Sequence, residues 1–423
     1  MDTIFALSSG APPAAIAVVR ISGPKAGEAL AALAGSLPPP RRAVARTLRD
    51  ASGDLLDQAL VLWLPGPGTA TGEDLTELHL HGGRAVVAAV EQALAGLPGH
   101  RKAEPGEFTR RAFANGRIDL AEAEGLADLL VAETELQRRS ALAAAGGALS
   151  RQVESWREEV LRLSAAIEAV LDFSDEDDVS GLSAAFLRDV RELAAQLADW
   201  LARPRAEMLR EGFRIVLAGP PNAGKSSLFN ALIETEAAIT APTAGTTRDV
   251  IERNVALAGV PFTFVDTAGL RSQTADPIEQ VGIAKAEAEL LRADCVLWLG
   301  PEGQGPAAAW EIETKTDLAA PAKHHAHHRV SAMTGAGVDA LRRSLVNHAL
   351  AAMPKPGDVA LNARQHGLLG EAASGLGAIA EGEDLLLTAE KLRLARVSLD
   401  RLTGRASTED MLDALFGRFC IGK

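Results

Sequence analysis

The sequence predicts a multidomain α/β protein in which an α/β domain, residues 209–344, is inserted into a helical domain made of residues 118–208 and 345–423. A small α+β domain, residues 1–117, precedes both. Two observations predict this order. Strand, glycine-loop and helix patterns alternate in the central stretch, and helical spacing of apolar residues occurs on both sides of it. A length of 423 residues leaves room for about three domains.

The flanking domains are predicted from hydrophobic spacing. Before residue 117, short apolar runs alternate with turns rich in glycine and proline, which is typical of a small α+β domain. After residue 118, and again near the C-terminus, apolar residues recur every three or four positions, as on the buried face of a helix. These helical sets are Val153, Trp156, Val160, Leu163 and Ile167, and Leu392, Ala395, Leu399 and Leu402.

The composition excludes several classes of protein. Acidic residues outnumber basic ones by 56 to 43, and the formal net charge of −13 argues against a chain that coats nucleic acid through bulk charge, although a local basic patch stays compatible with it. The two cysteines, Cys295 and Cys420, are too few for a disulfide framework or a four-thiolate zinc site. No apolar stretch approaches the ~18 residues of a membrane span, and no signal peptide is recognisable. We therefore expect a cytoplasmic protein without membrane contact.

A phosphate-binding loop is predicted at residues 219–226. They read G-P-P-N-A-G-K-S and fit the pattern G-x-x-x-x-G-K-[ST], with an apolar run before them and a helical pattern after them. Glycines let backbone N–H groups surround a β-phosphate at the helix N-terminus. Lys225 would bring a positive charge to the β- and γ-phosphates, and the Ser226 hydroxyl would bind Mg²⁺.

Two further motifs complete the pattern of a nucleoside triphosphatase. Asp266-Thr267-Ala268-Gly269 follows an apolar run, so Asp266 can hold the water shell of the metal and the Gly269 N–H can sense the γ-phosphate. The G-T-T-R-D motif at residues 245–249 lies between the two motifs and supplies a threonine for the metal. The three motifs in this order predict hydrolysis of a nucleoside triphosphate.

The base is predicted less directly. Guanine is usually read by an N-K-x-D loop, and here the corresponding residues are Thr314-Lys315-Thr316-Asp317. Asp317 keeps the carboxylate and Lys315 can lie over the base, whereas Thr314 lacks the amide that normally steadies the loop. Ser331-Ala332-Met333 supplies the usual last base contact. We expect guanine binding with weakened or atypical affinity; an ordinary loop is the alternative.

Hydrolysis needs a group that orients the attacking water. Leu270 stands where a glutamine often does this, so another group must act. A monovalent cation beside the phosphates could replace an arginine finger, and Asn222 could coordinate it. Glu279 could order the water as a base. From the residues alone, a solvated helix face is the better interpretation of Glu279.

The whole chain resembles the MnmE (TrmE) family of potassium-activated tRNA modification GTPases. The three nucleotide motifs carry part of the resemblance, and the C-terminal F-C-I-G-K at residues 419–423 narrows it. Five N-terminal motifs add to the match, at residues 20–23, 72–78, 105–109, 112–116 and 119–124. The resemblance implies that the first domain binds a tetrahydrofolate derivative of the 5-formyl or methylene type and holds a homodimer. It also implies that the G domains pair across K⁺ while GTP is hydrolysed.

The resemblance further implies a partner and a reaction. Together with the flavoprotein MnmG (GidA), the family adds a carboxymethylaminomethyl or aminomethyl group to C5 of the wobble uridine of certain tRNAs, with a folate one-carbon unit. Two alternatives stay open. A folate-binding scaffold with a degenerate G domain is suggested by Thr314. A ribosome-assembly GTPase would leave the N-terminal motifs and the C-terminal tail unexplained.

The resemblance assigns a role to individual residues. The candidate catalytic residues are Glu279, Lys225, Arg248 and Cys420. The Mg²⁺ ligands would be Ser226 and Thr247, and the K⁺ ligands would be Asn222, Ala241, Thr243 and Thr246. The further nucleotide contacts would be Ala223, Gly224, Ser227, Asp266, Thr267, Ala268, Gly269, Thr314, Lys315, Asp317, Ser331, Ala332 and Met333. The folate contacts map to Arg20, Glu77, Arg117 and Lys423, with Arg117 where the family often has lysine.

Several of these residues have a plain structural interpretation beside the functional one. Without the resemblance, Arg20 and Glu77 would be a surface ion pair. The Cys420 thiolate could attack a uracil ring or a one-carbon intermediate, or the residue could be a small buried hydrophobe beside Phe419. We expect Cys295 in a core strand. The histidines of residues 324–328 are more typical of a solvated loop than of a metal site, and residues 300–309 also read as a loop.

Overall fold

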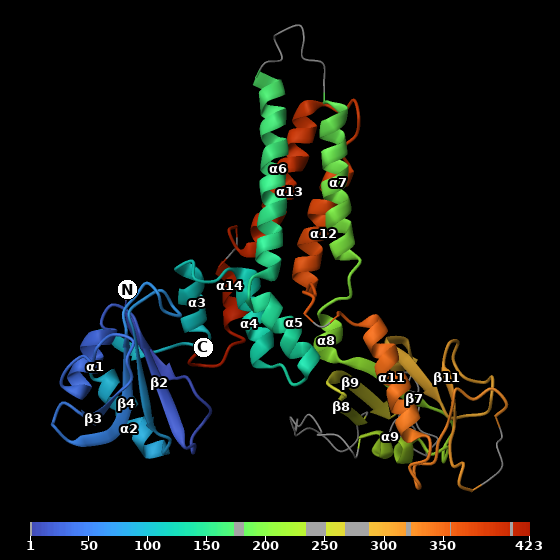
Figure 1. Ribbon diagram of the computed structural model, residues 1–423, viewed down its shortest axis with the longest axis horizontal. Coiled ribbons are helices and arrows are strands. Elements are labelled where there is room, and N and C mark those ends of the chain that lie inside the picture. Colours follow the sequence, from blue (N-terminus) through green and yellow to red (C-terminus); the bar gives the residue numbers. More distant parts are fainter. Residues whose placement is uncertain are drawn as a thin grey trace, which may run out of the picture. The chain divides into compact units, whose positions relative to one another are not determined.

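A computed structural model describes seven stretches of the chain: residues 2–172, 182–233, 251–266, 287–318, 323–355, 357–406 and 409–423. The chain divides into two compact units (Figure 1). Unit 1 consists of Met1–Ala127, Leu149–Glu154 and Leu399–Lys423, and unit 2 consists of Asp128–Ala148 and Ser155–Ser398.

Unit 1 is built on a six-stranded sheet with the strand order β3-β4-β5-β2-β1-β6. Its neighbouring strands are antiparallel apart from the parallel pair β1 and β6. The strands are β1 (Thr3–Leu7), β2 (Ile16–Ser22), β3 (Val44–Arg49), β4 (Leu55–Leu64), β5 (Leu75–His81) and β6 (His100–Lys102). Helices α1 (Ala26–Ala34) and α2 (Arg84–Ala95) cover one face, where alternate strand residues such as Val19, Ile21 and Val61 are buried against them. The opposite face stays open over β2, β4 and β5, and it carries polar side chains.

The rest of unit 1 joins the two ends of the chain. Helices α3 (Glu107–Ala114), α4 (Leu120–Leu130) and α14 (Glu409–Phe416) share an apolar cluster that includes Phe416 and Phe419. The C-terminal tail then lies against β1, because the Ser8 Oγ donates to the Gly422 O at 2.8 Å. Gly422 has a φ of 97°, and a Cβ there would lie 2.0 Å from the Leu7 O, so this close approach requires glycine.

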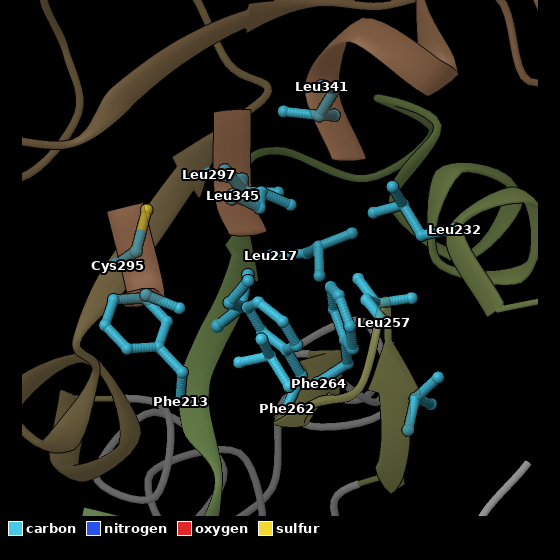
Figure 2. Packing of buried hydrophobic residues seen from close by; sticks show 14 of the residues in the cluster. Phe213, Leu217, Leu232, Leu257, Phe262, Phe264, Cys295, Leu297, Leu341 and Leu345 are labelled. Carbon is cyan, nitrogen blue, oxygen red and sulfur yellow. The ribbon is translucent and has the colours of Figure 1, made fainter. Parts of the chain in front are cut away.

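Unit 2 contains a six-stranded sheet with the strand order β12-β11-β10-β7-β9-β8. Its neighbours are parallel except for the β8–β9 hairpin. The strands are β7 (Phe213–Ala218), β8 (Ile251–Leu257), β9 (Val260–Asp266), β10 (Cys295–Trp298), β11 (Trp310–Glu313) and β12 (His328–Arg329). Helices α9 (Lys225–Ile233) and α11 (Val338–Ala352) pack on it. Figure 2 shows this core, which gathers Leu232 of α9, Leu341 of α11 and the aromatic rings of β7 and β9.

Cys295 is part of that core, as the sequence predicted. It lies in β10 beside Leu297 (Figure 2), and burial, with the nearby charge of Asp294, raises the pKa of its thiol to about 12. After β10 no helix occurs before β11, which confirms the loop expected at residues 300–309. The indole of Trp298 fills this space, since a Cβ on Gly300 or Gly305 would lie 2.4 or 2.6 Å from its ring. The loop therefore needs glycine at both positions.

The helical part of the chain surrounds the insertion. Helices α5 (Glu135–Ala145), α6 (Ala148–Asp172), α7 (Ala184–Leu201) and α8 (Glu207–Glu211) precede β7, and α12 (Ala363–Gly377) and α13 (Leu385–Thr403) follow α11. All nine apolar residues predicted to face a helical core are buried. The predicted fold class is confirmed: an α/β domain interrupts a helical domain and follows an α+β domain. In the described residues no helix is both long and apolar enough to cross a bilayer.

Candidate functional site

The phosphate loop follows β7 directly and ends where α9 begins at Lys225. Its turns use the left-handed region at Asn222, with a φ of 60°, and at Gly224, with a φ of 93°. The Lys225 Nζ donates to the Gly219 O and the Pro220 O, both at 2.9 Å. The ammonium group is therefore already held inside the loop, among neutral carbonyls that a phosphate oxygen would outcompete.

One candidate magnesium ligand, Ser226, meets Asp266, the carboxylate predicted to hold the water shell of the metal, at the C-terminal end of β9. Residues Leu217 of β7 and Asp266 of β9 are in register. The Ser226 Oγ, one residue into α9, donates to the Asp266 Oδ2 at 2.7 Å. Asp266 is 1% exposed. A hydroxyl and a buried carboxylate are hard oxygen donors, so this pair fits Mg²⁺ and its water shell.

The base-recognition loop is tied to the phosphate loop by two hydrogen bonds. The Thr314 Oγ1 donates to the Ala223 O at 2.6 Å, and the Lys315 Nζ donates to the Asn222 O at 2.6 Å. Thr314 lacks the amide that the sequence comparison expected, yet its hydroxyl steadies the loop against the phosphate loop. The bond from Thr314 to the Ala223 O thus connects the base loop to the phosphate loop, although threonine is not the usual residue at this position.

The carboxylate that would read the base is also oriented. The Ser331 Oγ donates to the Asp317 Oδ1 at 2.5 Å, and the Thr334 N–H donates to the Ser331 Oγ at 3.2 Å. Asp317 is exposed, as is Met333, so both side chains are accessible from solvent. Ser331 is buried beneath it. The structure therefore brings together the two segments that the sequence proposed for the base.

Part of the predicted nucleotide site lies outside the described residues. These residues are Ala241, Thr243, Thr246, Thr247, Arg248, Thr267, Ala268, Gly269 and Glu279. The residues that the structure places are Asn222, Ala223, Gly224, Lys225, Ser226, Ser227, Asp266, Thr314, Lys315, Asp317, Ser331, Ala332 and Met333.

The candidate folate residues occupy the open face of the unit 1 sheet. Arg20 of β2 and Glu77 of β5 are in register, and the Arg20 Nε and Nη2 donate to the Glu77 Oε1 at 3.1 and 2.9 Å. The His79 Nε2 lies 3.3 Å from the Glu77 Oε2. Burial alone raises the pKa of Glu77, but the hydrogen bonds and charges of Arg20 and His79 outweigh it and hold the pKa below its ordinary 4.5. The guanidinium of Arg20 lies over the ring of Phe108, with 5.9 Å between the Arg20 Cζ and the ring centroid.

His79 is a member of this cluster that the sequence reasoning missed. The spacing of the two residues could have indicated it, because Glu77 and His79 are two positions apart in one strand and so share a face. The interpretation of Arg20 and Glu77 as an ion pair is confirmed, and the pair is half-buried rather than fully exposed.

The other two folate candidates lie elsewhere in unit 1. Lys423 ends the C-terminal tail, and its backbone N–H donates to the Cys420 O at 3.2 Å. The residue before it, Gly422, accepts the hydrogen bond from Ser8. Arg117 is exposed and its stem packs beside Gly72. Arg20 and Glu77 are thus in direct contact, whereas Arg117 and Lys423 lie on other segments of unit 1.

Two further predictions from the sequence concern Cys420 and the histidine tract at residues 324–328. Cys420 is exposed, so its interpretation as a buried small hydrophobe is wrong; Phe419 fills the core instead. Residues 324–327 of the tract form a loop before β12, as expected, whereas His328 is the first residue of that strand. The backbone N–H groups of His324 and His325 both donate to Glu302 at 2.8 Å, and no metal-ligand cluster of three groups occurs among the residues described.

Comparison with known proteins identifies the family. Residues 3–117 match the family described as GTP-binding protein TrmE N-terminus, and residues 120–420 match the MnmE helical domain. The tRNA modification GTPase MnmE of Erythrobacter litoralis is 65% identical over the full length of both chains, and that of Novosphingobium aromaticivorans is 63% identical, also over both full lengths. The solved G domain of the T. maritima FeoB iron transporter aligns with 24% identity, 32% of this chain, 98% of that chain and a TM-score of 0.23. The chain belongs to the MnmE (TrmE) family of tRNA modification GTPases.

Proposed function

We propose that this GTP hydrolase is activated by K⁺ and works with the flavoprotein MnmG in the cytoplasm. Its GTP cycle drives addition of a carboxymethylaminomethyl or aminomethyl group to C5 of the wobble uridine of certain tRNAs. The three parts of the chain then carry separate tasks: residues 1–117 bind folate and form the homodimer, residues 209–344 hydrolyse GTP, and the helical residues 118–208 and 345–423 connect the two.

One observation carries the GTP assignment: the base loop and the phosphate loop are already fastened together. The Thr314 hydroxyl and the Lys315 ammonium bond to consecutive phosphate-loop carbonyls, and Ser331 orients Asp317. This arrangement supports recognition of a purine that offers two N–H donors to a carboxylate, as guanine does. The intact Lys225, Ser226 and Asp266 argue against a degenerate G domain, and the matched N-terminal family argues against a ribosome-assembly GTPase.

Hydrolysis is assigned to the phosphate loop and the two metal ions. Ser226 and Thr247 would hold Mg²⁺, which withdraws charge from the β- and γ-phosphate oxygens when it is bound. Lys225 adds a second positive charge at the same oxygens. Asn222, with Ala241, Thr243 and Thr246, would hold K⁺. Glu279 would orient the attacking water, and Arg248 belongs to the same proposed machinery.

The N-terminal domain is proposed to bind the tetrahydrofolate derivative. Glu77 offers two acceptor oxygens to a pterin edge, and Arg20, Arg117 and Lys423 are cations suited to the folate carboxylates. The Arg20–Glu77 ion pair would rearrange when this ligand binds, because Arg20 and His79 already contact both Glu77 oxygens. Cys420, exposed on the neighbouring tail, is the proposed thiol for the one-carbon chemistry.

The homodimer is supported by apolar side chains on the same open face. Ile16 is 59% exposed and Leu60 is 42% exposed, and each lies opposite a histidine of β5 in register. Water-exposed aliphatic residues on the central part of a sheet are typical of a protein–protein interface. Dimerisation would bury them beside the proposed folate residues.

Phosphate release from GTP in KCl and in NaCl at equal ionic strength tests the proposal. Strong stimulation by K⁺ is expected, because a cation at Asn222 would supply positive charge beside the phosphates, as an arginine finger does. Equal rates in the two salts would contradict the Asn222 assignment. No hydrolysis in either salt, with no binding of a GTP analogue, would contradict the GTPase assignment itself.

A further inference from the structure

The outer edge of the unit 1 sheet carries an unusual row of arginines. Strand β3 pairs with β4 alone, so its other edge is unpaired in the described residues. This strand and the turn before it contain four arginines and no acidic residue over residues 41–49: Arg41, Arg42, Arg46 and Arg49. The row spans about 25 Å if the chain is extended throughout.

These arginines keep their charge uncompensated. In the part of the chain that the structure describes, none of the four forms an ion pair. Arg41 donates to the Gly68 O at 2.8 Å, Arg49 to the Gly53 O at 2.8 Å and Arg46 to the Ala45 O at 3.2 Å. A backbone carbonyl orients a guanidinium without neutralising it, and each guanidinium has five N–H donors, so several stay available for a ligand.

Two of the acidic residues near the row in sequence, Asp50 and Asp57, have partners of their own. Asp50 caps its own turn, since its Oδ1 accepts from the Ser52 N–H and hydroxyl and from the Asp54 N–H. Asp57, opposite Leu48 on β4, binds the His81 Nδ1 at 2.7 Å and the His81 N–H at 2.8 Å. Two exposed helical arginines, Arg138 and Arg393, differ from this row, because each pairs with a glutamate three residues earlier.

We propose that this arginine edge binds the phosphodiester backbone of the tRNA substrate. Arginine matches phosphate geometry, and an edge with positive side chains on both faces can follow a backbone along its length. Arg46 shares its face with buried Leu48, and Arg49 projects from the other face. Residues 1–117 contain 12 basic and 11 acidic residues, whereas the whole chain has a formal charge of −13, so the edge is a local positive site on an acidic protein. The inference rests on the proposed function, in which tRNA is the substrate.

The experiment must distinguish phosphate binding by these arginines from protection of the sheet edge. Charged side chains on an edge strand also prevent two sheets from joining edge to edge. If edge protection is the only role of these arginines, replacing them with neutral residues increases self-association and does not change the affinity for tRNA. The phosphate proposal makes the opposite prediction.

The test compares two full-length variants with equal change in net charge. R42Q/R46Q/R49Q removes three arginines of the edge, and R138Q/R162Q/R393Q removes three exposed, ion-paired helical arginines. Binding of an unmodified tRNA transcript is titrated at several KCl concentrations, with GTP hydrolysis as the control for folding. We expect roughly tenfold or greater loss of affinity for the edge variant, and a salt dependence of log K that is shallower by about two, since each lost phosphate contact removes about 0.7–0.9 from the slope.

Each outcome decides a separate point. A tRNA affinity and slope equal to wild type in the edge variant would overturn the inference, and so would an equal loss in the helical variant. Self-association of the edge variant with unchanged tRNA affinity would assign the arginines to edge protection. A wild-type protein that does not bind tRNA, alone or with its flavoprotein partner, would instead remove the proposed function on which the inference rests.

Discussion

The nucleotide site of unit 2 and the charged cluster of unit 1 prepare for their ligands in opposite ways. In unit 2, the ammonium groups of Lys225 and Lys315 and the hydroxyl of Thr314 donate to backbone carbonyls, which orient these side chains without neutralising an ammonium charge. In unit 1, Arg20 and Glu77 bond to each other and cancel their charges. A phosphate would therefore displace neutral acceptors in unit 2, whereas the folate derivative proposed for unit 1 would compete with an ion pair. The nucleotide site of unit 2 can thus accept a phosphate without breaking an ion pair, whereas ligand binding at Arg20 and Glu77 would compete with one.

The largest effect is expected at Lys225. Lys225→Ala removes the positive charge nearest to the β- and γ-phosphates, and loss of one such electrostatic contact costs about 10²–10³ in rate. Phosphate release in KCl measures it. Binding of 5-formyltetrahydrofolate by the same variant should equal wild type, because Arg20 and Glu77 lie in the other unit. A parallel loss of folate binding would show that the variant is misfolded and would void the comparison.

A smaller effect, with a characteristic pH dependence, is expected at Glu77. The folded-state pKa of Glu77 lies below its ordinary 4.5, so the carboxylate stabilises the fold above that pH. The stabilisation is lost as the pH falls from about 4.5 through the folded-state pKa, because the group then binds a proton in both states. Glu77→Gln leaves Arg20 without its acid, and we expect it to lower the free energy of unfolding at pH 7 by about 1–2 kcal/mol.

Hydrogen exchange in peptides that cover β2 and β5 measures this loss locally, at pH 7 and at pH 4. The difference between wild type and Glu77→Gln should shrink at the lower pH. Glu91→Gln is the matched control, since Glu91 pairs with the exposed Lys102 and should change little. A difference that grows as the pH falls would contradict the sign argued for Glu77.

The contrast between the sites also explains what the sequence could predict. Local spacing was enough for the helical faces, for Cys295 in its strand and for the phosphate loop between β7 and α9, because each depends on neighbours in the chain. Contacts between distant segments were beyond it. The bond from Ser8 to Gly422 joins residues 414 positions apart, and no pattern within either segment indicates the other. The contact of Glu77 with Arg20 depends likewise on how β2 and β5 pair, whereas His79 lies on the same strand as Glu77.

The smallest effect sharpens the contrast most, because it concerns the one residue where the sequence departs from the usual base loop. Thr314→Val keeps the shape of the side chain but removes the hydroxyl that donates to the Ala223 O. A partly buried carbonyl then loses its donor, which costs about 1 kcal/mol and predicts roughly fivefold weaker binding of a GTP analogue. Thr314→Asn should restore the contact through its amide, and Thr316→Val, two residues on, should bind as wild type does. If Thr314→Val also binds normally, the base loop does not depend on the phosphate loop, and unit 2 is less prepared for its ligand than its hydrogen bonds indicate.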